Sequence, residues 1–132
     1  MVDSKYNDII ISLTTLTQRD VLKWQKDDLS QLGFFCFSSD MQKFLVDKFY
    51  SIIEGKQVTC LNLTIFKASN SDKIVDEINL CPTMAGEELD NFKLLNILYK
   101  QVESQYDKYL NTTKGPILTN ITESLQRQLQ SN

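Results

Sequence analysis

Few side chains in this chain could do chemistry, and the cysteines Cys36, Cys60 and Cys81 are the first of them. Thiols form disulfides, bind metals or act as nucleophiles. Their odd number and wide spacing are more typical of buried, reduced thiols than of a disulfide framework or a metal-ligand cluster. We therefore expect three reduced cysteines in the core.

Acid–base and metal chemistry would have to proceed without histidine, which the chain lacks. Histidine is the side chain best suited to proton transfer near neutral pH and the commonest metal ligand. The acids Glu87, Glu88 and Asp90 begin a predicted helix, where they favour its dipole, and Asp47 and Glu77 are expected on solvent-facing strand positions. The sequence therefore predicts no catalytic residue, no metal site and no cofactor, and hence no enzyme.

The charge and composition of the chain limit the classes of partner that it could bind. Neither G-x-G-x-x-G nor G-x-x-x-x-G-K-[ST] occurs, so no glycine-rich phosphate-binding loop is expected. The formal net charge is -3, and the 14 basic residues are scattered. Nucleic acid is therefore not expected as a partner. The start lacks a basic segment followed by an apolar one, and no apolar run approaches the roughly 20 residues of a membrane span. We expect a cytoplasmic protein that does not enter a membrane.

Aromatic and apolar side chains are the better candidates for function. A lone tryptophan after a helix either covers the sheet as part of the core or anchors a partner. Tyrosines on a helix combine an apolar ring with a polar hydroxyl, which suits an interface. The candidate interface residues are Trp24, Leu94, Leu98, Tyr99, Tyr106 and Tyr109.

The first half of the chain must supply a helix and a sheet. From Ser4 onward, apolar residues recur at three- and four-residue steps through Leu16, which predicts an amphipathic N-terminal helix. Alternating or β-branched runs, with Glu54-Gly55-Lys56 as a tight reversal, predict an antiparallel meander of three to four strands. The predicted strands cover Phe34–Phe37, Phe44–Ile53, Val58–Phe66 and Ile74–Leu80.

The second half is helical. Between Ala85 and Leu110, apolar residues step by three and four, which predicts a long helix of about 39 Å, part of which should project. Gly115-Pro116 predicts a break before a C-terminal helix at about 116–130, which folds back or packs on a neighbouring protomer. The predicted fold is a single α+β domain, 1–132, with both late helices packed on one face of the sheet.

The long helix suggests the function. Leu94, Ile97 and Leu98 give it a second apolar flank, which the N-terminal helix, the C-terminal helix or a second copy must cover. We expect a small non-catalytic protein-interaction module of the inhibitor, immunity or accessory-subunit type, acting through its helical face on a protein partner or as a homodimer. The alternative is a small-molecule-binding or sensor domain with a pocket between sheet and helix. Its lining residues would be Phe35, Phe37, Phe49 and Tyr50.

Overall fold

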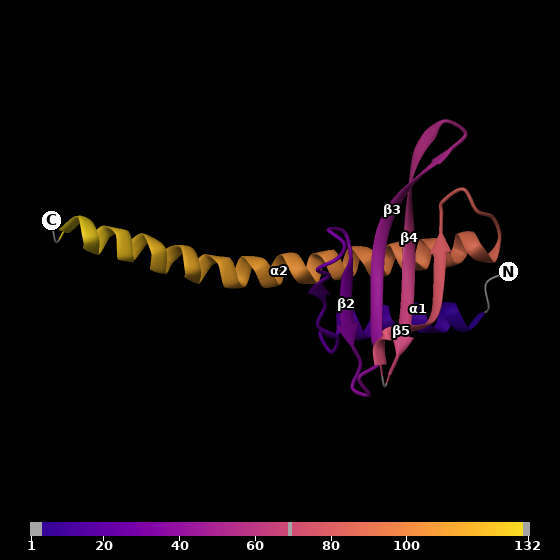
Figure 1. The fold of residues 1–132 in the computed structure, drawn as a ribbon, viewed down its shortest axis with the longest axis horizontal. Coiled ribbons are helices and arrows are strands. Elements are labelled where there is room, and N and C mark those ends of the chain that lie inside the picture. The colour runs from indigo at the N-terminus through magenta and orange to yellow at the C-terminus, as the bar shows by residue number, and fades with distance from the viewer. Residues whose placement is uncertain (1–3, 69, 131–132) are drawn as a thin grey trace.

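The computed structural model describes residues 4–68 and 70–130 and confirms the α+β fold (Figure 1). The elements are α1 (Ser4–Gln18), β1 (Gln25–Lys26), β2 (Phe34–Phe37), β3 (Lys43–Ile53), β4 (Lys56–Lys67), β5 (Asn70–Leu80) and α2 (Glu87–Gln130). The strands form one antiparallel sheet in the order β1-β2-β3-β4-β5. The sheet has one strand more than the three to four expected, because β1 is a two-residue edge strand whose sequence has no strand-like alternation.

The β3–β4 hairpin closes where the sequence predicted a tight reversal. Glu54 and Gly55 both have positive φ values, 52° and 76°. Two consecutive residues of this kind make the two-residue turn that matches the twist of antiparallel strands. Glycine adopts this conformation without strain, whereas Glu54 is a non-glycine residue in the left-handed region.

One face of the sheet carries the core. The strand register aligns Phe34, Val46, Leu63 and Ile78 in a row across four strands. All four side chains are buried in the main hydrophobic cluster, together with residues of α1 and α2 such as Leu95. Complete burial of one such side chain contributes about 1.5–3 kcal/mol, so this row is a main source of stability.

Both helices lie on that same side of the sheet (Figure 1), and α1 packs against α2. Ile10 and Leu13 of α1 belong to the same buried cluster as Leu98 of α2, and Leu94 packs against it. The second apolar flank of α2 is therefore covered by the N-terminal helix. Only Ile97 of that flank stays half exposed, at 49%.

α2 is longer than expected, because the two predicted helices are joined in one bent helix (Figure 1). Its 44 residues correspond to about 66 Å. Residues 115–116 remain helical, so the predicted break does not separate two helices. A proline removes one backbone hydrogen bond and bends a helix, and the turns on either side can still be helical. The first half of α2 packs on the sheet, and the second half extends past it.

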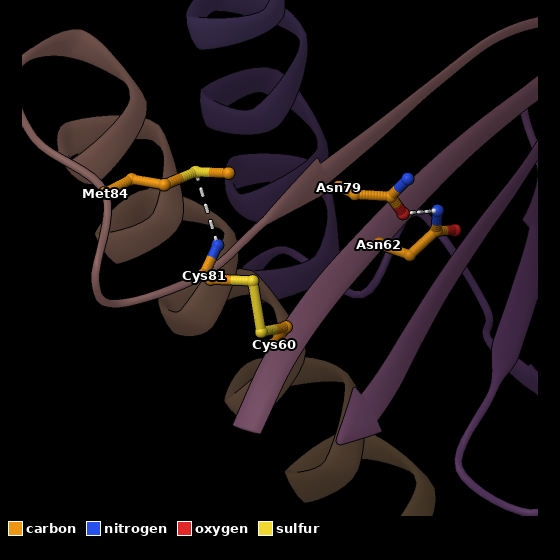
Figure 2. Close-up of a disulfide and its surroundings, with 5 residues drawn as sticks. All are labelled: Cys60, Asn62, Asn79, Cys81 and Met84. Atoms are coloured by element: carbon orange, nitrogen blue, oxygen red, sulfur yellow. Dashed lines mark hydrogen bonds between the residues drawn. A yellow bond between two sulfur atoms is a disulfide. The ribbon is translucent and has the colours of Figure 1, made fainter. Parts of the chain in front are cut away.

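A disulfide between Cys60 and Cys81 is the main departure from the sequence-based expectation (Figure 2). The expectation of three reduced cysteines is wrong in the structure, where Cys36 alone is free. Cys60 and Cys81 lie one residue beyond the paired Leu61 and Leu80 of β4 and β5, which brings their Cα atoms to 4.4 Å. That separation is within the range of a disulfide. The register of β4 and β5 places the two cysteines opposite each other. The spacing of the cysteines along the sequence does not reveal this register.

Candidate interaction surfaces

The second half of α2 is exposed along its described length. We call residues 107–130 the tail and the rest of the described chain the body. Every tail residue from Asp107 to Thr112 and from Ile117 to Gln130 is exposed. The tail carries six large aliphatic side chains that are 41–78% exposed, Leu110, Ile117, Leu118, Ile121, Leu125 and Leu129. No helix in the described part of the chain has both the length and the apolarity needed to cross a bilayer.

The aliphatic row of the tail continues the core-facing side of α2. Ile117 follows Tyr99 by five turns at 3.6 residues per turn, which puts both residues on the same side of the helix. Tyr99 is buried in the core, whereas Ile117 is 52% exposed. Steps of four residues then lead through Ile121 and Leu125 to Leu129, as on the apolar side of an amphipathic helix. The side that meets the sheet in the body thus meets solvent in the tail.

The predicted interface residues do not form one surface. Trp24, Leu98 and Tyr99 are only 5%, 0% and 2% exposed, so the core of the same chain occupies them and a partner cannot reach them in this fold. Leu94 and Tyr106 are partly buried against that core. Tyr109 is the exception, at 61% exposed, and it lies in the tail.

Trp24 covers the core and also closes a polar junction. Its Nε1 donates a 2.9 Å hydrogen bond to Thr17 Oγ1, which in turn donates to the Leu13 carbonyl at 2.7 Å. Its backbone N–H donates to Gln105 Oε1 at 2.9 Å, and Gln105 Nε2 donates to the Leu22 carbonyl at 2.7 Å. Gln105 therefore fastens the segment after α1 to the last buried turn of α2.

A groove of about 890 Å³ lies over this junction, between the end of α1, the segment leading into β1, and the root of the tail. Lys23, Lys26 and Lys108 line it, with Asp20 as its single acid. The rings of Tyr106 and Tyr109 also line it, with their centroids 6.2 Å apart and their planes at 34°. We call this feature the lysine groove.

The sheet face away from the helices has a polar centre. The register aligns Asp47, Asn62 and Asn79 there, and Asn62 Nδ2 donates to Asn79 Oδ1 at 2.6 Å (Figure 2). Asn62 Nδ2 also donates to Glu77 Oε1 at 2.7 Å, and Thr64 Oγ1 donates to Asn62 Oδ1 at 2.7 Å. Asn62 thus has hydrogen-bond partners for its oxygen and its nitrogen within the fold, although a shallow hollow of about 630 Å³ lies above it.

The four aromatics that were expected to line a pocket between sheet and helix do not meet there. Phe49 lines the hollow on the face away from the helices. Tyr50, the next residue of the same strand, points to the opposite face and is 55% exposed. Phe35 and Phe37 contact each other edge to face, with ring centroids 5.9 Å apart.

Chemically reactive groups are few among the described residues. Burial raises the pKa of the Cys36 thiol to about 12, which leaves it protonated and unreactive at neutral pH. Burial, followed by the charge of Glu103, raises the pKa of Tyr99, whose hydroxyl donates to the Leu32 carbonyl. No group of three metal-ligating side chains was found in these residues, and Glu87, Glu88 and Asp90 occupy the first turn of α2.

Comparisons with protein-family models, with curated proteins and with solved structures found no match for this chain. The functions of the tail and of the lysine groove therefore have to be inferred from the geometry of these two surfaces. The aliphatic row was recognisable in the sequence from its spacing. The lysine groove was not recognisable, because Lys23 and Lys26 lie far from Lys108 along the sequence and only the fold brings them together. The nearest signal was the pair of lysines on either side of Trp24.

Proposed function

We propose that this chain is a small non-catalytic protein-interaction module, of the inhibitor, immunity or accessory-subunit type, that associates through the tail. The observation that carries the proposal is the row of exposed aliphatic side chains from Leu110 to Leu129. Helix-in-groove contacts use apolar anchors three, four and seven residues apart, and Leu110, Ile117 and Ile121 have this spacing.

Helix energetics support a partner for the tail. In water, most of the stability of a natural helix comes from packing of its apolar side, and short isolated helices are marginal. The tail residues whose exposure the structure describes, 107–112 and 117–130, are exposed and receive no such packing from the body. A partner that covered the row would supply it, at about 1.5–3 kcal/mol for each large aliphatic side chain that becomes fully buried.

The partner that fits the row is a second copy of the chain, paired antiparallel. Leu118 and Ile121 flank the middle of the row, and Leu110 and Leu129 lie at nearly equal distances from it. A two-fold axis there sets Leu118 against Ile121 of the second copy, as an isologous interface requires. Antiparallel pairing also leaves the two bodies at opposite ends, whereas parallel pairing would bring them side by side (Figure 1).

The polar side of the tail favours a protein surface over a membrane surface. Helices that lie on membranes carry many lysines and arginines on their polar side. The tail has threonine, asparagine, serine and glutamine there, with acids and bases such as Glu123 and Arg127 both present. With three basic and two acidic residues, the tail has a net charge of only +1, so repulsion between two tails is weak.

Light scattering on the eluting protein tests this proposal. The expected particle has twice the 15.2 kDa mass of the chain. The double variant Ile121→Gln/Leu125→Gln should elute as a monomer. The matched control Asn120→Gln/Ser124→Gln has the same spacing one residue earlier along the helix, at two exposed polar positions, and it should remain a dimer.

Amide hydrogen exchange tests whether the tail itself becomes protected when the chain associates. Association should protect the amides of residues 117–130, and the Ile121→Gln/Leu125→Gln variant should lose that protection. A chain that stays monomeric at every concentration, with tail amides exchanging like those of an unstructured peptide, would overturn the proposal. A dimer that survives the double variant would also overturn it, because the contact would then lie elsewhere.

The proposal includes a cytoplasmic site of action. It is supported by the odd number of cysteines, which leaves Cys36 as a free thiol in the core. Structural disulfides persist mainly in oxidising compartments, so in the cytoplasm Cys60 and Cys81 would be reduced. Fractionation of the source cells, combined with trapping of free thiols, tests both points. Recovery of the oxidised protein outside the cytoplasm would contradict this location.

A further inference from the structure

The lysine groove concentrates positive charge on an acidic chain. The whole sequence has 14 basic and 17 acidic residues. The groove, in contrast, is lined by Lys23, Lys26 and Lys108 and by a single acid, Asp20. Local charge opposite to that of the whole chain attracts an anion to this place rather than to the rest of the surface.

The lysines are not used up by ion pairs within the chain. Lys23 lies 3.6 Å from Asp20, but both side chains are 70% exposed, and such a pair is easily exchanged for another anion. The Lys26 ammonium lies over the ring of Phe34, with Nζ 4.4 Å from the ring centroid, and this cation–π contact positions the ammonium without neutralising its charge. Across residues 4–68 and 70–130, neither Lys26 nor Lys108 forms an ion pair with a carboxylate.

The polar groups at the floor of the groove are hydrogen-bonded to each other within the protein. Gln105 holds the backbone at Leu22 and Trp24, and Thr17 holds the Trp24 indole. These polar groups are satisfied inside the protein, so a ligand does not have to reorganise them. A preformed site of this kind binds with a smaller ordering cost.

The remaining wall is aromatic. Tyr109 is 61% exposed and lies beside the Tyr106 ring at the root of the tail. Exposed tyrosine rings stack on flat heterocycles, and positively charged grooves with such rings bind nucleotides. The volume of about 890 Å³ is within the range of small-molecule sites, which is about 300–1,000 Å³.

We propose that the lysine groove is a binding site for a nucleoside monophosphate or a chemically equivalent organic anion, with the lysines on the phosphate and Tyr109 against the ring. This site is separate from the aliphatic row of the tail, and it does not depend on the proposed association. It gives the chain a ligand-binding activity at the junction of body and tail.

Calorimetric titration with AMP, adenosine and inorganic phosphate tests the site. AMP should bind at least about tenfold more tightly than either of its halves, because only AMP engages the lysines and the ring together. Added salt should weaken AMP binding, since charge attraction is screened. Equal binding of AMP and inorganic phosphate would overturn the nucleotide assignment, and so would no binding of AMP at all.

Two pairs of variants locate the site. Lys26→Gln/Lys108→Gln should lose at least about tenfold in AMP affinity, whereas Lys73→Gln/Lys93→Gln removes two exposed lysines outside the groove and should not. Tyr109→Ala should weaken AMP but not phosphate, and Tyr50→Ala, which truncates a tyrosine of similar exposure, should change neither.

Light scattering on the same variants keeps the two functions apart, because loss of AMP binding without a change in mass assigns the effect to the groove. Unchanged AMP affinity in the groove variants would overturn the site. If poly-glutamate displaced bound AMP and bound more tightly than AMP, the nucleotide site would also be overturned. The groove would then be assigned to an acidic polypeptide.

Discussion

Thr17 Oγ1 accepts a 2.9 Å hydrogen bond from the indole Nε1 of Trp24, and both side chains are buried. The bond joins the last turn of α1 to the segment that leads into the sheet. It explains why a tryptophan with a polar atom can cover this core: its only donor is satisfied by a residue of the same chain.

Replacing Thr17 by valine should therefore destabilise the protein by about 1–3 kcal/mol, because the Trp24 donor remains buried without a partner. Urea unfolding followed by tryptophan fluorescence measures the change. Thr15→Val is the matched control, since Thr15 also donates to a carbonyl four residues earlier, but in a hydrogen bond that is exposed to solvent. Equal losses in the two variants would mean that the Thr17–Trp24 bond contributes nothing of its own.

The core role of Leu98 gives a second prediction. Leu98→Ala should cost about 2–5 kcal/mol, as for other large-to-small substitutions in a packed core. Ile97→Ala, one residue earlier and 49% exposed, should cost much less. Denaturant unfolding of the two variants compares them directly. A loss of association with unchanged stability in Leu98→Ala would restore Leu98 as an interface residue.

The disulfide predicts a redox-dependent stability. Reduction of Cys60–Cys81, whose cysteines are 21 residues apart, should lower the free energy of unfolding by about 3 kcal/mol from loop entropy. Thermal unfolding with and without dithiothreitol measures this effect, and a Cys60→Ala/Cys81→Ala variant should not respond to the reductant. Three titratable thiols in the unreduced, unfolded protein, instead of one, would show that the bond does not form.

Cys36 predicts a loss of stability at high pH. Its pKa is raised by burial from 9.0 to about 12, so the folded state keeps a proton that the unfolded state releases above pH 9. Its contribution is complete below pH 9 and falls as the pH rises toward 12, by up to about 4 kcal/mol. Cys36→Val should flatten the measured slope of stability against pH in this range. Tyr99, whose pKa is also raised, adds a loss of the same sign that this variant should keep. An unchanged slope in Cys36→Val would contradict the burial effect.

Local patterns predicted most of the elements. The alternation of Leu61 and Leu63 identified the core side of β4, and both side chains are buried as expected. Glu54-Gly55 identified the hairpin. In each case the signal lies within a few residues, where backbone geometry and side-chain period act directly.

The features that the sequence did not reveal depend on residues brought together by the fold. The Cys60–Cys81 bond requires the register of β4 and β5. The burial of Tyr99 requires the sheet beneath it, and the lysine groove requires the turn that follows α1 to meet α2. Pro116 is the opposite case. Its local sequence predicts a break between two helices, but the residue lies within one continuous helix.

The clamp that Gln105 makes on the backbone at Leu22 and Trp24 turns the remainder of α2 into a lever arm. From residue 105 to residue 130 the arm measures about 38 Å, so a rotation of about 10° at the clamp displaces its tip by roughly 7 Å. A small rearrangement beside Trp24 is therefore magnified at Leu129. A pair of fluorescent labels on the body and near residue 130 would read such a displacement as a change in energy transfer.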